Sequence, residues 1–89
     1  MDFEWDADKA EENLADHGVS FFEAAGVFGD TLSSTAPDPD HSEGERRLLI
    51  FGQSLAQRHL VVSFTERGDR MRIISAREMT RRERRAYEQ

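Results

Sequence analysis

Arginine is the residue type with the clearest chemical role in this chain. The segment 58–77 is marked at its ends and near its middle by five of them: Arg58, Arg67, Arg70, Arg72 and Arg77. A guanidinium carries a planar fork of N–H donors that matches the oxygens of a phosphate. We therefore predict an anion-recognising surface, with Arg77 and Arg67 as phosphate ligands and with Arg72, Arg70 and Arg46 in support. A salt bridge to an acidic side chain is the alternative for each arginine.

Proton transfer would need other side chains, and several residue types in the chain could supply it. The candidates are His41, Glu45, Lys9, Tyr87 and His59. Each also has a simpler interpretation: solvation for His41 and Lys9, an ion pair with Arg46 for Glu45, a structural hydrogen bond for His59, and packing against the sheet for Tyr87.

The acidic stretch 38–45 could suggest a metal site, because it contains Asp38, Asp40, His41, Glu43 and Glu45. It lacks the Asp-x-Asp-x-Asp-Gly order and the terminal Glu of a calcium-binding loop. The chain has no cysteine, so thiolate metal sites and disulfides are excluded. We predict chemistry without a metal or another cofactor.

Charge divides the chain into two unlike halves. Residues 1–45 contain thirteen acidic residues and one basic residue, and residues 46–89 contain eleven arginines and five acidic residues, within a net charge of −6. Local clustering sets the potential that a ligand meets, so a basic face for an anionic substrate is compatible with the acidic total. Mutual neutralisation of the halves on a solvated surface is the alternative.

The segments that would position these side chains predict one α+β domain over residues 1–89. Apolar residues alternate along 58–77 around the turn Glu66-Arg67-Gly68-Asp69, which predicts a β-hairpin. Strands are also predicted near residues 3–5, 31–35 and 46–52. Joined by short loops, the later strands would form a small antiparallel sheet.

Capping signals predict three helices. Asp6 and Gly18 delimit the first, Ser20 and Gly29 the second, and Thr80 with Glu83 opens a C-terminal helix through Tyr87. The first two helices carry enough apolar surface to cover one sheet face, which leaves the other face for the C-terminal helix and a shallow arginine-lined groove. No apolar run approaches the roughly 20 residues of a membrane span, and we predict a cytoplasmic protein.

Several short motifs occur in a fixed order along the chain: Phe3-Glu4-Trp5-Asp6, Asn13-Leu14 with His17-Gly18-Val19-Ser20-Phe21, Glu23-Ala24-Ala25 with Val27-Phe28, Asp40-His41 with Glu45-Arg46, and Arg72-Ile73-Ile74-Ser75-Ala76-Arg77. Together these motifs resemble the BrnT toxin family. The match spans nearly the whole chain. Ala7 stands where similar sequences often have Pro, a change that the first turn of a helix tolerates.

The resemblance implies a RelE-like fold and a ribonuclease toxin of a type II toxin-antitoxin module. It further implies that cleavage of RNA inhibits translation, and that a BrnA-type antitoxin with a ribbon-helix-helix DNA-binding domain neutralises the toxin. Operator DNA would be bound only through the antitoxin, with a heterotetramer as the expected complex. A noncatalytic module that uses the same arginines to bind a protein or nucleic acid is the alternative.

Overall fold

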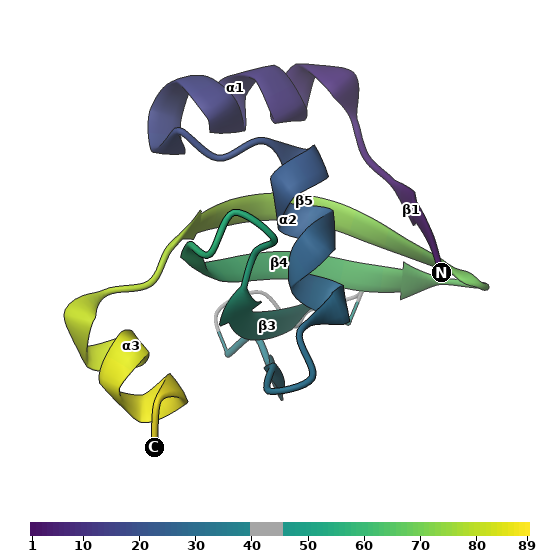
Figure 1. Ribbon diagram of the computed structural model, residues 1–89. Helices are drawn as coiled ribbons and strands as arrows, with labels where there is room; N and C mark the ends of the chain where they lie inside the picture. The colour runs from purple at the N-terminus through teal and green to yellow at the C-terminus, as the bar shows by residue number, and fades with distance from the viewer. Residues whose placement is uncertain (40–45) are drawn as a thin grey trace.

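The computed structural model describes residues 1–39 and 46–89. In chain order the elements are β1 (Asp2–Glu4), α1 (Ala7–His17), α2 (Phe21–Gly26), the 3₁₀ turn η1 (Val27–Gly29), β2 (Ser34–Pro37), β3 (Leu48–Gln53), β4 (His59–Arg67), β5 (Arg70–Glu78) and α3 (Arg81–Tyr87). The strands form one sheet in the order β1-β5-β4-β3-β2, with helices around it (Figure 1). The α+β class is confirmed, and η1 is a helical turn that the sequence did not predict as separate.

The later strands pair antiparallel as predicted, but the predicted antiparallel sheet has one parallel edge. Strands β2 to β5 pair antiparallel in succession, but β1 pairs parallel with β5, where Phe3 lies opposite Met71. Short connections make successive strands antiparallel. No such connection links β1 to β5, because nearly the whole chain lies between them. The sheet is therefore mixed.

The predicted hairpin is confirmed as β4 and β5, the two longest strands. Gly68 adopts a φ of 61° in the turn, a left-handed conformation that costs glycine little. The register shifts between Ser63 and Phe64, so β5 contains an irregularity near Ile74. This hairpin forms the middle of the sheet and carries most of the candidate site.

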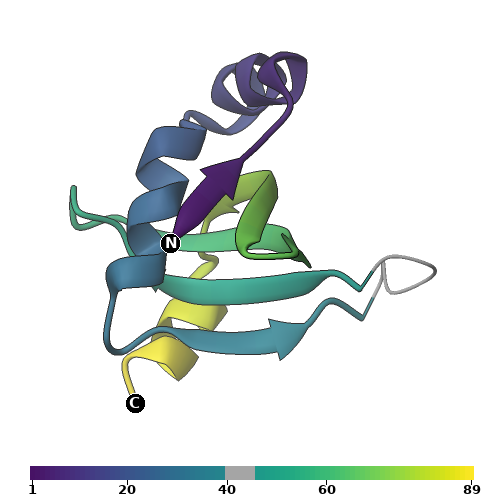
Figure 2. The same cartoon turned by 90° about the vertical axis from the view of Figure 1, so that its right-hand side faces the viewer.

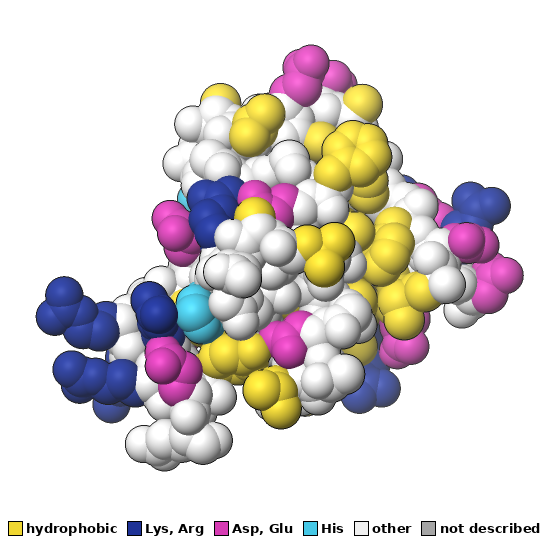
Figure 3. Space-filling view, in the orientation of Figure 1, with side chains coloured by type: hydrophobic (Ala, Val, Ile, Leu, Met, Phe, Trp, Pro, Cys, Tyr) yellow, Lys and Arg dark blue, Asp and Glu magenta, His cyan; other side chains and the backbone are white. Residues whose placement is uncertain are grey.

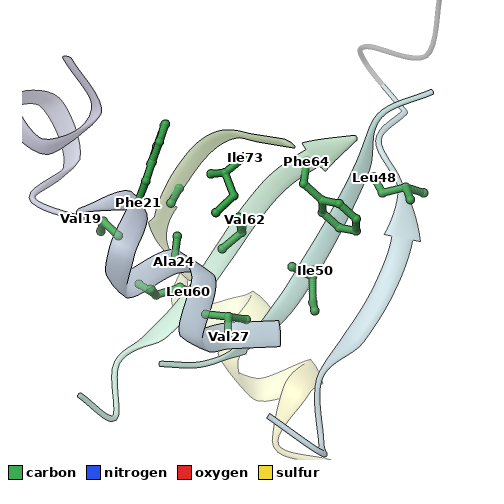
Figure 4. Close-up of a cluster of buried hydrophobic side chains, with 11 residues drawn as sticks. Val19, Phe21, Ala24, Val27, Leu48, Ile50, Leu60, Val62, Phe64 and Ile73 are labelled. Carbon is green, nitrogen blue, oxygen red and sulfur yellow. The ribbon is translucent and has the colours of Figure 1, made fainter. Parts of the chain in front are cut away.

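The core lies between one face of the sheet and helix α2 (Figure 4). Strand β4 contributes Leu60, Val62 and Phe64, all buried, and helix α2 covers them with Phe21 and Ala24. Alternation along β3 and β4 turns the intervening side chains to the opposite face. We call that opposite side the second face. Its residues on these two strands include Leu49, Phe51, Val61 and Ser63.

Helix α1 is fixed to the open edge of β5 by a single buried polar side chain. Asn13 is 6% exposed, and its Nδ2 donates to the carbonyls of Val19 at 2.9 Å and Ala76 at 2.8 Å. Its Oδ1 accepts from the Ala76 amide at 3.1 Å. Strand β1 ends at Glu4, so Asn13 pairs with the β5 backbone beyond it. Figure 2 shows α1 lying past this edge of the sheet.

Helix α3 begins with the predicted capping box. The Thr80 side chain accepts from the Glu83 amide, and the Glu83 carboxylate accepts from the Thr80 amide. None of its residues is buried. Phe51 of β3 and Tyr87 of α3 line a hollow of about 290 Å³, which places α3 beside the second face. The sequence predicted this position for the helix.

Candidate active site

A groove on the second face gathers two guanidinium groups, two hydroxyl groups and the carboxylate of Asp38. It has a volume of about 390 Å³, and its lining includes Arg47, Arg77, Ser63 and Ser75. Strand pairing explains the arrangement, because Ser63 lies opposite both Ser75 and Leu49, and Arg77 lies two residues from Ser75. Guanidinium and hydroxyl donors together suit a phosphate group.

Arg47 lines the groove, whereas the sequence prediction had named its neighbour Arg46. Arg46 is exposed, and its carbonyl accepts a hydrogen bond from Thr65 Oγ1 at 2.8 Å. Arg47 lies two residues before Leu49, so in an extended chain its side chain points to the same side as Leu49, which faces the groove. That two-residue alternation was the signal for choosing Arg47. The two arginines are adjacent, and Arg47 rather than Arg46 lines the groove.

Arg77 is held in place by a carboxylate of α3. Its Nη1 and Nη2 donate to the two carboxylate oxygens of Glu83 at 2.7 and 2.9 Å, and Nη1 also donates to the Glu78 carbonyl. The hydrogen bonds from Arg77 lower the pKa of Glu83 to about 2, and Glu83 in turn raises the pKa of Arg77. Arg77 is thus oriented and permanently charged, and two of its five N–H donors remain for a ligand.

A second hollow adjoins the groove across β5. Its lining includes Lys9 and His17 of α1 together with Ile74 and Ser75, which also line the groove. Asn13 positions both α1 residues by holding this helix to β5. Lys9 was a predicted proton carrier, and the structure brings it to the rim. His17, which the prediction did not include, lies there too, in the last turn of α1.

Three other predicted phosphate ligands form a separate cluster at the hairpin tip. Arg72 Nη1 lies 2.7 Å from a Glu4 carboxylate oxygen, and Arg67 and Arg70 lie at 3.8 and 4.0 Å. Arg70 and Arg77 are seven residues apart on β5, roughly 23 Å at 3.3 Å per residue. The structure therefore does not bring Arg67 and Arg77 to the same phosphate.

The Tyr87 side chain makes a structural contact between α3 and the sheet. Its hydroxyl donates to Asp30 Oδ2, which also accepts from the Gln53 amide. The hydrogen bond to Asp30 raises the pKa of Tyr87 to about 12 and lowers that of Asp30. The Tyr87 ring meets His59 edge to face at 5.5 Å. This contact ties α3 to the sheet and disfavours Tyr87 as a base, because a phenol with so high a pKa gives up its proton reluctantly.

His41 and Glu45, two predicted proton carriers, lie outside the described residues. Within the described ranges 1–39 and 46–89, no three His, Cys, Asp or Glu side chains are grouped as metal ligands would be. In the same part of the chain no helix is long and apolar enough to cross a membrane.

Comparison with known proteins decides the family. The model of the ribonuclease toxin BrnT of type II toxin-antitoxin systems matches residues 5–83. The chain belongs to the BrnT family. It also resembles the crystal structure of the Brucella abortus ribonuclease toxin BrnT, with a TM-score of 0.67, 24% identity, and coverage of 91% of this chain and 99% of that one. A comparison with curated proteins gives no match.

Membership of the BrnT family makes this chain a ribonuclease toxin with an antitoxin as its partner. The matched range includes Lys9, Asn13, Arg47 and Arg77, so the groove and the helix that forms its rim lie inside the family domain. The solved Brucella structure has the same fold as this chain over nearly the whole of its length.

Proposed function

We propose that this chain is a metal-independent endoribonuclease of RelE-like fold that cleaves RNA in the groove between Arg47 and Arg77. In this reaction the ribose 2′-OH attacks the adjacent phosphorus, its proton leaves to a base, and the bond to the 5′ oxygen breaks as that oxygen gains a proton. The products are a 2′,3′-cyclic phosphate and a 5′-OH. Cleavage of messenger RNA in the cytoplasm would inhibit translation.

The observation that carries the proposal is the pairing of two guanidinium groups in one groove within an otherwise acidic protein. Extra negative charge builds on the phosphate oxygens in the transition state, and fixed positive donors stabilise it. Glu83 fixes Arg77 without blocking all of its donors, so little reorganisation accompanies the reaction. Arg47 faces the same groove from the adjoining β3–β4 side of the sheet.

Lys9 and His17 are the proposed proton carriers at the rim. Imidazole is the side chain most often used for general acid and base catalysis, and an ammonium can protonate a leaving oxygen. Ser75 lines both hollows and joins these residues to the phosphate-binding groove. The arginines clustered on Glu4 lie farther along β5, where they would contact the RNA backbone outside the cleavage position.

A cleavage assay on labelled RNA tests this function. Wild-type protein should yield fragments ending in a cyclic phosphate either from free RNA in EDTA or, in a separate arm, from RNA on ribosomes in buffer containing Mg²⁺. Arg77→Ala and Arg47→Ala should each cleave about 10² to 10³ times more slowly, the usual effect of losing a preorganised donor. Arg81→Ala, an exposed arginine of α3, is the matched control and should keep full activity. No cleavage by the wild type under either condition would favour the noncatalytic alternative.

The antitoxin partner is proposed to be of the BrnA type, with a ribbon-helix-helix domain that binds operator DNA. Two toxin and two antitoxin chains would assemble into a heterotetramer through dimerisation of the antitoxin. Light scattering on the purified complex measures this stoichiometry, and a one-to-one complex that does not dimerise would contradict it.

A further inference from the structure

An apolar groove between α1 and α2 lies apart from the proposed cleavage site. Its volume is about 170 Å³, and its apolar lining consists of Trp5, Ala10, Leu14, Phe21 and Phe22. Phe22 is 81% exposed and Leu14 is 53% exposed. Figure 3 shows hydrophobic side chains gathered over these helices. A small protein that leaves a phenylalanine this exposed beside a groove has a candidate interaction surface.

The aromatic side chains of the groove are already ordered. Trp5 meets Phe21 edge to face at 5.9 Å and Phe22 at 5.0 Å. Phe21 is buried in the core and anchors the three aromatic rings, whereas Phe22 faces outward. Preordered aromatic rings lose little conformational freedom on binding, which makes them effective anchors for a partner.

An acidic side chain, that of Glu11, forms part of the wall of the apolar groove. Asp8 lies three residues earlier on α1, whereas Glu12 and Asp16 line the hollow on the β5 side of the helix. Within residues 1–39 and 46–89, neither Glu11 nor Asp8 forms an ion pair with another described side chain. A polyanion such as RNA would be repelled here, and a segment that combines apolar and basic side chains would be attracted.

The two flanks of α1 separate this surface from the cleavage groove. Ala10, Glu11 and Leu14 face α2, whereas Lys9 and His17 face β5. A partner held on the α2 side would therefore not need to compete with RNA for the same side chains. The BrnT family has a protein antitoxin as partner, which supplies an occupant of suitable chemistry.

We propose that the groove formed by Trp5, Leu14 and Phe22 docks a lysine- or arginine-rich segment of the antitoxin, whose apolar side chains cover Phe22. The inference rests on the antitoxin partnership within the proposed function. It assigns Glu11 of α1 a role in recognition and leaves the arginine groove to RNA.

Binding of purified BrnA-type antitoxin from the same operon tests the docking surface by calorimetry. Trp5 is the only tryptophan in the chain, so its emission also reports occupancy when any antitoxin tryptophan is replaced by phenylalanine. Phe22→Ser should weaken binding at least tenfold and abolish the emission change. Leu32→Ser, which alters a leucine that is 76% exposed outside the groove, should bind within twofold of the wild type.

Charge reversal supplies an independent measurement. Glu11→Lys should weaken binding severalfold and reduce its dependence on salt, while Glu66→Lys at the exposed hairpin tip should not. The Phe22→Ser variant should still cleave RNA at the wild-type rate and should escape neutralisation.

Three results would overturn the docking inference. Full antitoxin affinity of both Phe22→Ser and Leu14→Ser would refute it and leave the proposed nuclease untouched. Failure of the wild type to bind the antitoxin would refute the partner assignment as well. Dimerisation of the free wild type, lost in Phe22→Ser, would show that a second copy of this chain occupies the groove instead.

Discussion

Asn13→Ala should destabilise the protein strongly, although it removes a polar side chain from the middle of a helix. The substitution deletes three buried hydrogen bonds and leaves the Ala76 amide and the Val19 and Ala76 carbonyls without their partner. At a net value of about 1 kcal/mol for each bond, the free energy of unfolding should fall by about 3 kcal/mol. For a domain of this size that corresponds to a fall in Tm of more than about 10 °C.

Urea denaturation followed by far-UV circular dichroism measures this loss. Glu12→Ala, at the exposed neighbouring position of α1, is the matched control and should change the unfolding free energy by less than about 0.5 kcal/mol. A loss below about 1 kcal/mol for Asn13→Ala would refute the view that one side chain fixes α1 to β5. Because α1 carries Lys9 and His17, the variant should also cleave RNA more slowly at temperatures where it remains folded.

Two further predictions concern the elements around the groove. The ordinary pKa of a Glu is 4.5 and that of Glu83 is about 2, so its ion pair with Arg77 stabilises the folded state above pH 4.5 and is lost as the pH falls toward 2. Because the pair is partly exposed to solvent, its contribution to the unfolding free energy at pH 7 is reduced to about 1 kcal/mol. The unfolding free energies of Glu83→Gln and the wild type should differ by that amount at pH 7 and converge in acid. A difference that does not change with pH would contradict the role of this ion pair. Gly52→Ala should lower the unfolding free energy by about 1 to 3 kcal/mol, because an added Cβ would lie 2.9 Å from Val27 Cγ1. Thermal denaturation measures this loss, and an unchanged Tm would show that the contact relaxes without cost.

Local signals in the sequence were sufficient for most of the fold. Asp6, Gly18 and Thr80 act in the structure as the capping rules predict, and Gly68 occupies the hairpin turn. The direction of β1 could not be predicted, because no short loop constrains it. Burial along α1 also does not follow the apolar pattern of the sequence. Leu14 is apolar but exposed, whereas Asn13 is polar but buried, because its side-chain amide pairs with the edge of β5.

The candidate site was predictable only in part. Residue types led to the prediction of arginines on the hairpin as phosphate ligands, but the division of these arginines between Glu83 and Glu4 depends on long-range contacts. Arg47 could have been found from its spacing of two residues from Leu49, which puts both side chains on the same side of an extended segment. Lys9 and His17 reach the rim only because Asn13 places α1 against β5, a contact between residues 63 positions apart.

The relative cleavage rates of Arg47→Ala and Arg72→Ala show directly which group of arginines holds the scissile phosphate. Both remove a partly buried arginine, Arg47 just before β3 and Arg72 within β5, but only Arg47 lies in the groove, whereas Arg72 is paired with Glu4. Under single-turnover conditions Arg47→Ala should cleave RNA more slowly than the wild type by a factor of about 10² or more, and Arg72→Ala should lose less than about tenfold. Equal losses, or a larger loss for Arg72→Ala, would place the scissile phosphate at the hairpin tip and contradict the account.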